Sequence, residues 1–371
     1  MRIPAGSVVN ALLIRLRLIG DVVFTTPAIA ALRRRFPQGR LSYLVEPEAA
    51  PVVLGNPHLD RVIVSPRPAG RLRLAAEFAL ARRLRAGRYD LVIDFHGGPR
   101  SSWLALATGA PRRIGYTVRG RSWMYTERVA RPRALRPRHS VENQWDLLEP
   151  LGIGPPSPAS DPTEMVEDLD ARAAVDRKLA AAGVRAEEQP VVIHVSAGNP
   201  FRRWPAANFV SLVAALCEAT DRPVVLTSGP SDASAARKIR EEARDRAGGR
   251  TSVRIVECGE FDLRELHALL GRSALFIGGD SGPLHIAGTT QVPIIGLFGP
   301  TLSARSRPWR DWSLPFVAVE MEALPCRPCD QRRCIPGDFR CLANLAPDRV
   351  VAAAGQLLGV AHERRATRYG R

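Results

Sequence analysis

Lysine is almost absent from this sequence, because arginine accounts for all but two, Lys178 and Lys238, of its 53 basic residues. Long apolar runs are absent as well. No stretch approaches the ~18 apolar residues that a membrane-spanning helix needs, so we expect no such helix. The first apolar run, Val8–Ile14, is soon interrupted by Arg15 and Asp21. It fits a buried first strand better than a secretory signal peptide, and we therefore expect a cytoplasmic protein.

Positive charge, in contrast, is abundant. The formal net charge is +16 in a chain of 371 residues that is 45% hydrophobic and 24% charged, which is a globular composition with room for two domains. Such a surplus favours an anionic partner, for example nucleic acid, an anionic membrane face or a phosphorylated substrate. Because the arginines are spread along the chain and no recognised nucleic-acid module is present, we expect no nucleic-acid partner.

Short apolar runs alternate with segments of helical periodicity along nearly the whole chain. This alternation predicts the α/β class, with parallel sheets that helices cover on both faces. A stretch rich in proline, serine and acidic residues, 152–170, interrupts the pattern and indicates a connection between two domains. The predicted strands are 8–14, 41–45, 61–64, 91–95 and 112–116 before this stretch, and 191–195, 223–227, 253–256, 274–277 and 293–298 after it.

The most informative stretch is residues 276–301, FIGGDSGPLHIAGTTQVPIIGLFGPT, which reads as strand, tight loop, helix and strand. Asp280 and Ser281 are both residue types that cap helix N-termini, and Gly282 and His285 follow them. A loop of small residues that leads into a helix can hold a phosphate or a hydroxyl-rich ligand. The alternative interpretation is an ordinary capped helix between two strands.

Gly20 and Asp21 follow the first predicted strand, and ligands of open α/β sheets collect at the carboxyl ends of strands. There a carboxylate can accept a proton from a substrate hydroxyl, although Asp21 can equally well cap the helix that begins at this point. The loop has no G-x-G-x-x-G pattern, which argues against a dinucleotide site.

Two strand ends in the second half of the chain also carry polar residues. Ser196 and Asn199 lie in a loop of small residues that leads to Arg202, and this combination suits a diphosphate. The alternative interpretation is a solvated basic loop before a helix. Asp232 lies near the start of the helix after the next strand. It can bind ribose hydroxyls or simply complement the helix dipole.

Four of the six cysteines form the pattern Cys326-x2-Cys329-x4-Cys334-x6-Cys341. This spacing is typical of a tetrahedral Zn or Fe site, and we interpret such a metal as structural, with the task of folding the surrounding loop. Unligated thiols are the alternative, and disulfides fit a cytosolic chain less well.

Three segments taken together resemble, in order, three motifs of the ADP-heptose:lipopolysaccharide heptosyltransferases, glycosyltransferase family 9. They are IRLRLIGDVVFTTPAIAALRRRFP (14–37), HVSAGNPFRRWPAANF (194–209) and GGDSGPLHIAGTTQVPIIGLFGPT (278–301). The resemblance covers nearly the whole chain. It implies the GT-B architecture, in which two Rossmann-like domains face each other across a cleft. It also implies transfer of heptose from an ADP-sugar with inversion and without a catalytic metal or other cofactor.

The resemblance also implies roles for individual residues. Asp21 would be the general base, next to Gly20. Arg202 stands where the family usually has lysine and would steady the departing diphosphate. The implied ligands of the donor are Ser196 and Asn199 for the phosphates, Asp232 for the ribose, and Asp280, Ser281, Gly282 and His285 for the sugar and diphosphate.

From these motifs we expect an acceptor-binding domain over residues 1–160, a linker over 161–185, a nucleotide-sugar-binding domain over 186–345 and a closing helix and tail over 346–371. The expected function is heptose transfer from ADP-heptose to a lipopolysaccharide core or lipid-linked acceptor, with peripheral contact at the cytoplasmic face of the inner membrane. The alternatives are a protein acceptor, a nucleotide-sugar isomerase on the same scaffold, and a non-catalytic nucleotide-binding protein.

Overall fold

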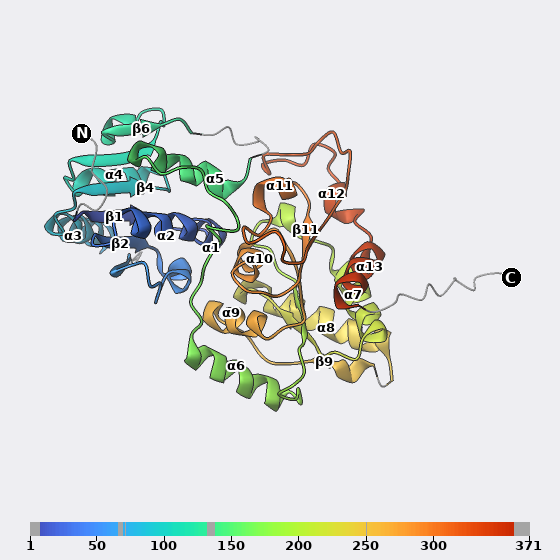
Figure 1. Cartoon of the computed structure of the whole chain (residues 1–371). Coiled ribbons are helices and arrows are strands. Elements are labelled where there is room, and N and C mark those ends of the chain that lie inside the picture. Colours follow the sequence, from blue (N-terminus) through green and yellow to red (C-terminus); the bar gives the residue numbers. More distant parts are fainter. Residues whose placement is uncertain (1–7, 66–69, 71, 132–137, 250, 360–371) are drawn as a thin grey trace. The chain divides into compact units, whose positions relative to one another are not determined.

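The computed structural model of the chain describes residues 8–65, 70, 72–131, 138–249 and 251–359 (Figure 1). They form two compact units. Unit 1 comprises Met1–Glu167 together with Ala304–Trp312, and unit 2 comprises Asp168–Ser303 together with Ser313–Arg371. Each unit is an α/β structure with its own parallel sheet.

The sheet of unit 1 has six strands in the order β3-β2-β1-β4-β5-β6, and every neighbouring pair is parallel. The central strands β1 and β4 are nearly or wholly buried, as expected for a parallel sheet with both faces covered. The strands are β1 Asn10–Ile14, β2 Arg40–Val45, β3 Arg61–Val64, β4 Leu91–Asp94, β5 Arg112–Tyr116 and β6 Glu127–Val129.

Helices α3 (Leu72–Ala86) and α4 (Pro99–Ala107) pack on this sheet (Figure 1). Leu80 and Leu84, one helical turn apart on α3, belong to one buried cluster with Leu12 of β1. Tyr125 completes the cluster beside η2. The remaining helical segments of unit 1 are α1 Ile19–Val23, α2 Thr26–Arg35, η1 Pro47–Val52, η2 Ser122–Met124, α5 Ser140–Trp145 and η3 Asp146–Leu151.

Unit 1 also includes a short segment from late in the chain, residues 304–312. Trp309 in this segment is 3% exposed, and its indole Nε1 donates to the carbonyl oxygen of Asp161 at 2.8 Å. Thr163 in turn donates its hydroxyl to the Trp309 carbonyl at 2.8 Å, and the ring of His139 packs on the indole with 4.6 Å between centroids. The segment is therefore part of the core of unit 1.

Unit 2 has a second six-stranded parallel sheet, in the order β12-β11-β10-β7-β8-β9. Its strands are β7 Val191–His194, β8 Val224–Thr227, β9 Ile255–Val256, β10 Leu275–Gly279, β11 Ile294–Phe298 and β12 Phe316–Glu320. Its helical segments are α6 Leu169–Ala181, η4 Pro200–Arg202, α7 Ala206–Ala219, η5 Pro230–Asp232, α8 Ala233–Ala247, η6 Ser252–Arg254, α9 Leu263–Gly271, α10 Gly282–Ala287, α12 Arg340–Ala343 and α13 Pro347–Leu358, while α11, Ser303–Ser306, lies at the boundary of the units.

The prediction of an α/β fold with parallel sheets is confirmed. Two local features were not expected. Residues 161–185, expected to be a linker, contain helix α6, because the Asp168 side chain accepts from the N–H groups of Asp170 and Ala171 and so caps it. The strand expected at 253–256 is reduced to β9 because η6 occupies its first part.

The closing helix is α13. The tail expected after it lies outside the described residues beyond position 359. The domain boundaries given above stay a prediction. Within the described ranges, no helix is both long and apolar enough to cross a bilayer.

A buried ionic network joins the strands and helices of unit 1. Arg100, in the first turn of α4, donates to Glu46 Oε1 at 2.7 Å, to Glu77 Oε1 at 2.9 Å and to Ser65 Oγ at 2.6 Å. Glu46 follows β2 and is only 2% exposed, and Glu77 belongs to α3. One guanidinium therefore compensates two carboxylates and ties the ends of β2 and β3 to both helices.

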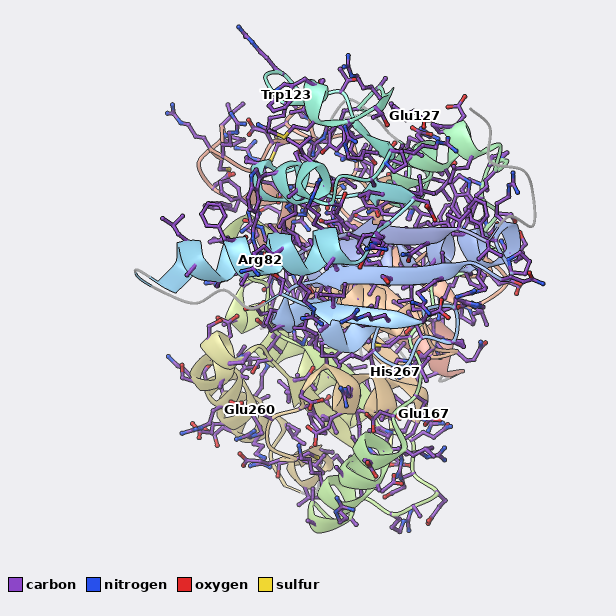
Figure 2. All side chains as sticks on the ribbon, turned by 90° about the vertical axis from the view of Figure 1, so that its left-hand side faces the viewer. Arg82, Trp123, Glu127, Glu167, Glu260 and His267 are labelled. Atoms are coloured by element: carbon purple, nitrogen blue, oxygen red, sulfur yellow. The ribbon has the colours of Figure 1, made fainter. Side chains whose placement is uncertain are left out.

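Replacing Arg100 with alanine should destabilise the protein by about 1.5–3 kcal/mol, because Glu46 and Glu77 would lose the charged hydrogen bonds that Arg100 donates to them. Urea unfolding followed by circular dichroism measures the change. Arg82→Ala is the matched control, since Arg82 is exposed on α3 (Figure 2) and should alter the free energy of unfolding by less than about 0.5 kcal/mol. Equal unfolding midpoints for the two variants would show that the network does not stabilise unit 1.

Candidate active site

Polar residues follow four neighbouring strands of unit 2. The strands β11, β10, β7 and β8 are adjacent in the sheet, and all their pairings are parallel. Their carboxyl ends therefore lie along one edge, where ligands of such sheets bind. The residues that follow these ends include Thr301, Asp280, Ser196 and the loop before Asp232.

Asp280, directly after β10, is the most buried acid of this edge, with 2% of its surface exposed. Its Oδ2 lies 3.1 Å from Arg202 Nη1 and accepts from the Thr301 hydroxyl at 2.5 Å, while its Oδ1 lies 3.5 Å from His285 Nε2. Burial raises the pKa of this carboxyl, but the contacts with His285, Arg202 and Thr301 outweigh it and lower the pKa to about 2. Asp280 is thus a permanent anion that fixes the groups around it.

Arg202 ends the short turn η4 (Pro200–Arg202) and is about one-third exposed. Its Nη1 donates to the Asp280 carbonyl oxygen at 2.9 Å, and its Nε donates to Gln331 Oε1 at 2.8 Å. Asn199 caps η4 with its Oδ1 and donates its Nδ2 to the same Gln331 oxygen at 2.8 Å. The guanidinium is therefore held on two sides while part of it faces solvent.

Ser196 and Asp232 lie side by side although they follow different strands. The Ser196 hydroxyl donates to Asp232 Oδ2, and Arg203 Nη2 lies 3.6 Å from Asp232 Oδ1. Arg203 also donates to the Ala197 carbonyl oxygen at 2.9 Å. The structure thus joins the predicted phosphate loop and the predicted ribose ligand into one polar cluster.

The helix after Asp280 differs from the expectation. α10 (Gly282–Ala287) has only six residues, and neither candidate cap bonds to its N–H groups through a side chain. The Ser281 hydroxyl donates to the Gly279 carbonyl at 3.2 Å, and the Asp280 carboxylate is engaged with Arg202 and Thr301. Because so short a helix has a weak dipole, the positive charge at this edge comes from arginine rather than from the helix.

In unit 1, Gly20 and Asp21 lie in the short helix α1, just after β1. Asp21 is not the N-cap, which is Leu18, so the capping interpretation of this carboxylate is wrong. Its Oδ2 instead accepts from Arg15 Nη2, and Arg15 Nη1 donates to the Phe95 carbonyl at 2.6 Å. The carboxylate, with 29% of its side chain exposed, is held at the carboxyl end of β1, and its Oδ1 makes no hydrogen bond or ion pair with the described residues.

Sequence reasoning missed His96, which follows β4 beside β1. Burial, together with the positive charges of Arg15 and Arg17, lowers the pKa of His96 to about 4, although Asp21 acts in the opposite direction. Its Nδ1 is buried and has no hydrogen-bond partner among the described residues. The sequence did contain a signal for this residue, because His96 is a polar residue directly after a predicted apolar strand.

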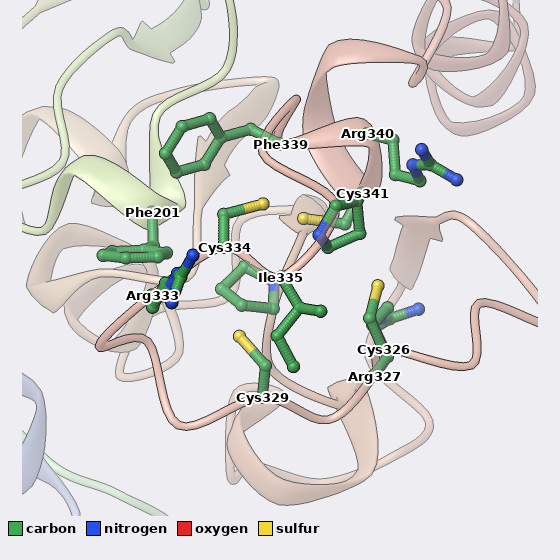
Figure 3. Close-up of a pocket in the computed structure, with 12 residues that line it drawn as sticks. Phe201, Cys326, Arg327, Cys329, Arg333, Cys334, Ile335, Phe339, Arg340 and Cys341 are labelled. Carbon is green, nitrogen blue, oxygen red and sulfur yellow. The ribbon is translucent and has the colours of Figure 1, made fainter.

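The four clustered cysteines line one hollow of unit 2, shown in Figure 3. Phe201, next to Arg202, also lines it, as do Phe339 and Ile335. All four cysteines are free thiols. Burial and the neighbouring cysteines raise the pKa of Cys341. In the part of the chain that the structure describes, no group of three or more His, Cys, Asp and Glu side chains is arranged to hold a metal ion.

Two doubly wound α/β units in one chain, each with a parallel six-stranded sheet, are the GT-B architecture. The model of glycosyltransferase family 9 (heptosyltransferase) matches residues 77–336. The chain is also 30% identical over 347 residues to lipopolysaccharide heptosyltransferase 3 of Escherichia coli K12, which covers 92% of this chain and 96% of that protein. The chain therefore belongs to glycosyltransferase family 9, as its three motifs predicted.

Solved structures show the same fold. A family 9 glycosyltransferase from Veillonella parvula superposes with a TM-score of 0.80 at 22% identity, covering 94% of this chain and 97% of that one. The ADP-heptose lipopolysaccharide heptosyltransferase II of E. coli gives a TM-score of 0.72 at 17% identity, covering 94% and 98%. At these identities the similarity supports the architecture alone.

Proposed function

We propose that this glycosyltransferase moves heptose from ADP-heptose to a lipopolysaccharide core acceptor. Family membership and the 30% identity with a lipopolysaccharide heptosyltransferase support this choice of donor and acceptor. The structural observation that carries the proposal is the pairing of Arg202 with the buried Asp280 at the carboxyl edge of the unit 2 sheet. This pairing holds a cation where a nucleotide diphosphate would lie.

The donor would bind to unit 2. Arg202 would neutralise the diphosphate as the sugar leaves, with Ser196 and Asn199 near the phosphates and Asp232 on the ribose hydroxyls. The residues Asp280, Ser281, Gly282 and His285 would surround the sugar and diphosphate. Charge stabilisation by fixed arginine groups can replace a metal ion, so we propose a metal-independent transfer.

The acceptor would bind to unit 1, next to Gly20 and Asp21. As the acceptor oxygen attacks the anomeric carbon, Asp21 would take its proton, and the bond between that carbon and the diphosphate would break to release ADP. Attack opposite the leaving group inverts the anomeric configuration. Arg15 contacts Asp21 through Oδ2, so Oδ1 is the oxygen available to the acceptor hydroxyl.

The test combines ADP-heptose, heptose-deficient lipopolysaccharide and the purified protein, with ADP release and product mass as readouts. Asp21→Asn should lower kcat by about 10²–10⁴-fold, because the amide cannot accept the proton, while ADP affinity stays unchanged. Glu48→Gln is the matched control, an exposed acid of unit 1 that should keep full activity. Transfer only to a protein acceptor would refute the proposed acceptor, and an unchanged kcat for Asp21→Asn would refute its role.

We further propose that Cys326, Cys329, Cys334 and Cys341 bind one structural zinc or iron ion. Four cysteines are a usual ligand set for such an ion, and here four free thiols line one hollow. To bind one ion, the four sulfur atoms would have to move closer together. Such an ion would fold the loop that lies against Phe201, next to Arg202.

Protein purified without chelator should contain about one zinc or iron ion per chain, measured by elemental analysis. Changing Cys326 and Cys329 to serine should abolish the metal and lower the unfolding temperature. Cys258→Ser, which alters a partly buried cysteine outside the cluster, should leave the metal content intact. Equal metal content in both variants would exclude the four-cysteine site.

We propose that unit 1 docks on an anionic membrane through the outer surface of α3, α4 and η2, where α4 contacts both other elements. Leu74 and Phe78 on α3 and Trp123 in η2 are 70%, 62% and 61% exposed.

The charges on this surface are mostly positive. The only acid of α3, Glu77, points inward to Arg100, whereas Arg82 and Arg83 are exposed without an ion-pair partner among the described residues. Exposed aromatic residues beside arginines are typical of surfaces that lie in an anionic lipid interface. Figure 2 shows Arg82 and Trp123 on this side of unit 1.

The protein should float with vesicles that contain phosphatidylglycerol and not with phosphatidylcholine vesicles. The double change Arg82→Glu and Arg83→Glu should weaken this binding by at least ~10-fold, because each basic residue near such a surface contributes about 1 kcal/mol. The charge-matched control changes the exposed Arg237 and Arg246 of α8 to glutamate. Equal loss in both variants, or self-association through this surface without vesicle binding, would refute the docking surface.

A further inference from the structure

The loop that carries the cysteines also reaches into the site around Arg202. Gln331 lies between Cys329 and Cys334, and its single amide oxygen Oε1 accepts from both Asn199 Nδ2 and Arg202 Nε, each at 2.8 Å. Gln331 has a backbone φ of 59°, in the left-handed region that residues other than glycine rarely adopt. Unusual backbone geometry of this kind tends to occur at functional sites.

Two further bonds anchor the loop beside the same site. The Cys329 N–H donates to the Pro300 carbonyl at 3.1 Å, and Arg327 Nη2 donates to the Thr301 carbonyl at 2.6 Å. Thr301 is the residue whose hydroxyl contacts Asp280. The position of Gln331 is thereby set relative to the strand ends that carry the site.

The bonds of Arg202 define the direction of its guanidinium. Nε donates to Gln331 and Nη1 donates to the Asp280 carbonyl oxygen, so two edges of the planar group are occupied. Nη2 has no partner among the described residues and is the nitrogen available to a ligand. A lysine at this position would need no such orientation, because an ammonium group is a point charge, whereas a guanidinium acts through a rigid fork.

We propose that Gln331 is a positioning residue for the donor diphosphate, which fixes the plane of Arg202 so that Nη2 meets the phosphate oxygens. This inference rests on the proposed binding of a nucleotide diphosphate at Arg202. It assigns the cysteine loop a part in substrate binding, in addition to any structural role of its thiols.

The test measures ADP and adenosine binding by calorimetry, together with kcat, for Gln331→Met, which keeps the length of the side chain but removes its strong acceptor. ADP should bind ~10-fold more weakly, while adenosine binding stays unchanged, because only the diphosphate contacts Arg202. The matched control is Arg332→Met, whose side chain is 88% exposed in the same loop and which should behave as wild type.

A double-mutant cycle separates positioning from loss of loop structure. In the Arg202→Lys background, Gln331→Met should alter ADP affinity by less than ~2-fold, since an ammonium group acts as a point charge and needs no fixed plane to meet the phosphate oxygens. An equal loss in both backgrounds would overturn the inference, as would unchanged ADP binding by Gln331→Met. Failure of the wild-type protein to bind ADP would instead overturn the proposed function, and this inference with it.

Discussion

A buried carboxylate at the end of a central strand is the constraint on which the carboxyl edge of the unit 2 sheet depends. Asp280 is withdrawn from water, and an ionised group in such a place is tolerated only when cations and hydrogen-bond donors surround it. Arg202 and Thr301 satisfy this requirement from other parts of the chain. The carboxylate thereby brings the loop after β7 and the loop after β11 to one point.

The carboxyl end of β1 in unit 1 is arranged differently. Asp21 is partly exposed and has one strong partner, Arg15, whose other amino group is fixed on the Phe95 carbonyl. A carboxylate with one oxygen engaged and one oxygen accessible suits proton transfer better than Asp280 does, because a buried acid whose pKa is about 2 is a poor base at neutral pH. The two aspartates therefore differ in chemistry because their surroundings differ.

The fold could be predicted from sequence because parallel strands buried on both faces are nearly continuous apolar runs, as in Ile294–Phe298 and the first three residues of Leu91–Asp94. Family membership followed from three local motifs. Helix α6 was missed because the acids around Asp168 resemble those of a linker, although one of them caps the helix. The roles of the individual site residues stay predictions.

Contacts between residues far apart in the chain could not be predicted from the sequence. Gln331 and Arg202 are 129 positions apart, and no pattern of residue types predicts the hydrogen bond between the Gln331 amide oxygen and Arg202. The position of His96 after a strand could be read from the sequence, but its low pKa could not, because that depends on burial and on arginines from other segments. Ser281 was misjudged for a local reason, because its hydroxyl bonds to a nearby carbonyl instead of the helix N–H groups.

The return of residues 304–312 to unit 1 has a consequence for how this protein can be divided. Because Trp309 is built into the core beside His139 and Thr163, the chain enters unit 2 at Asp168, returns to unit 1 at Ala304 and enters unit 2 again at Ser313. A chimera with a relative that exchanges unit 2 therefore requires three crossover points, after residues 167, 303 and 312. A single cut near residue 167 would produce a first half without one of its own tryptophans.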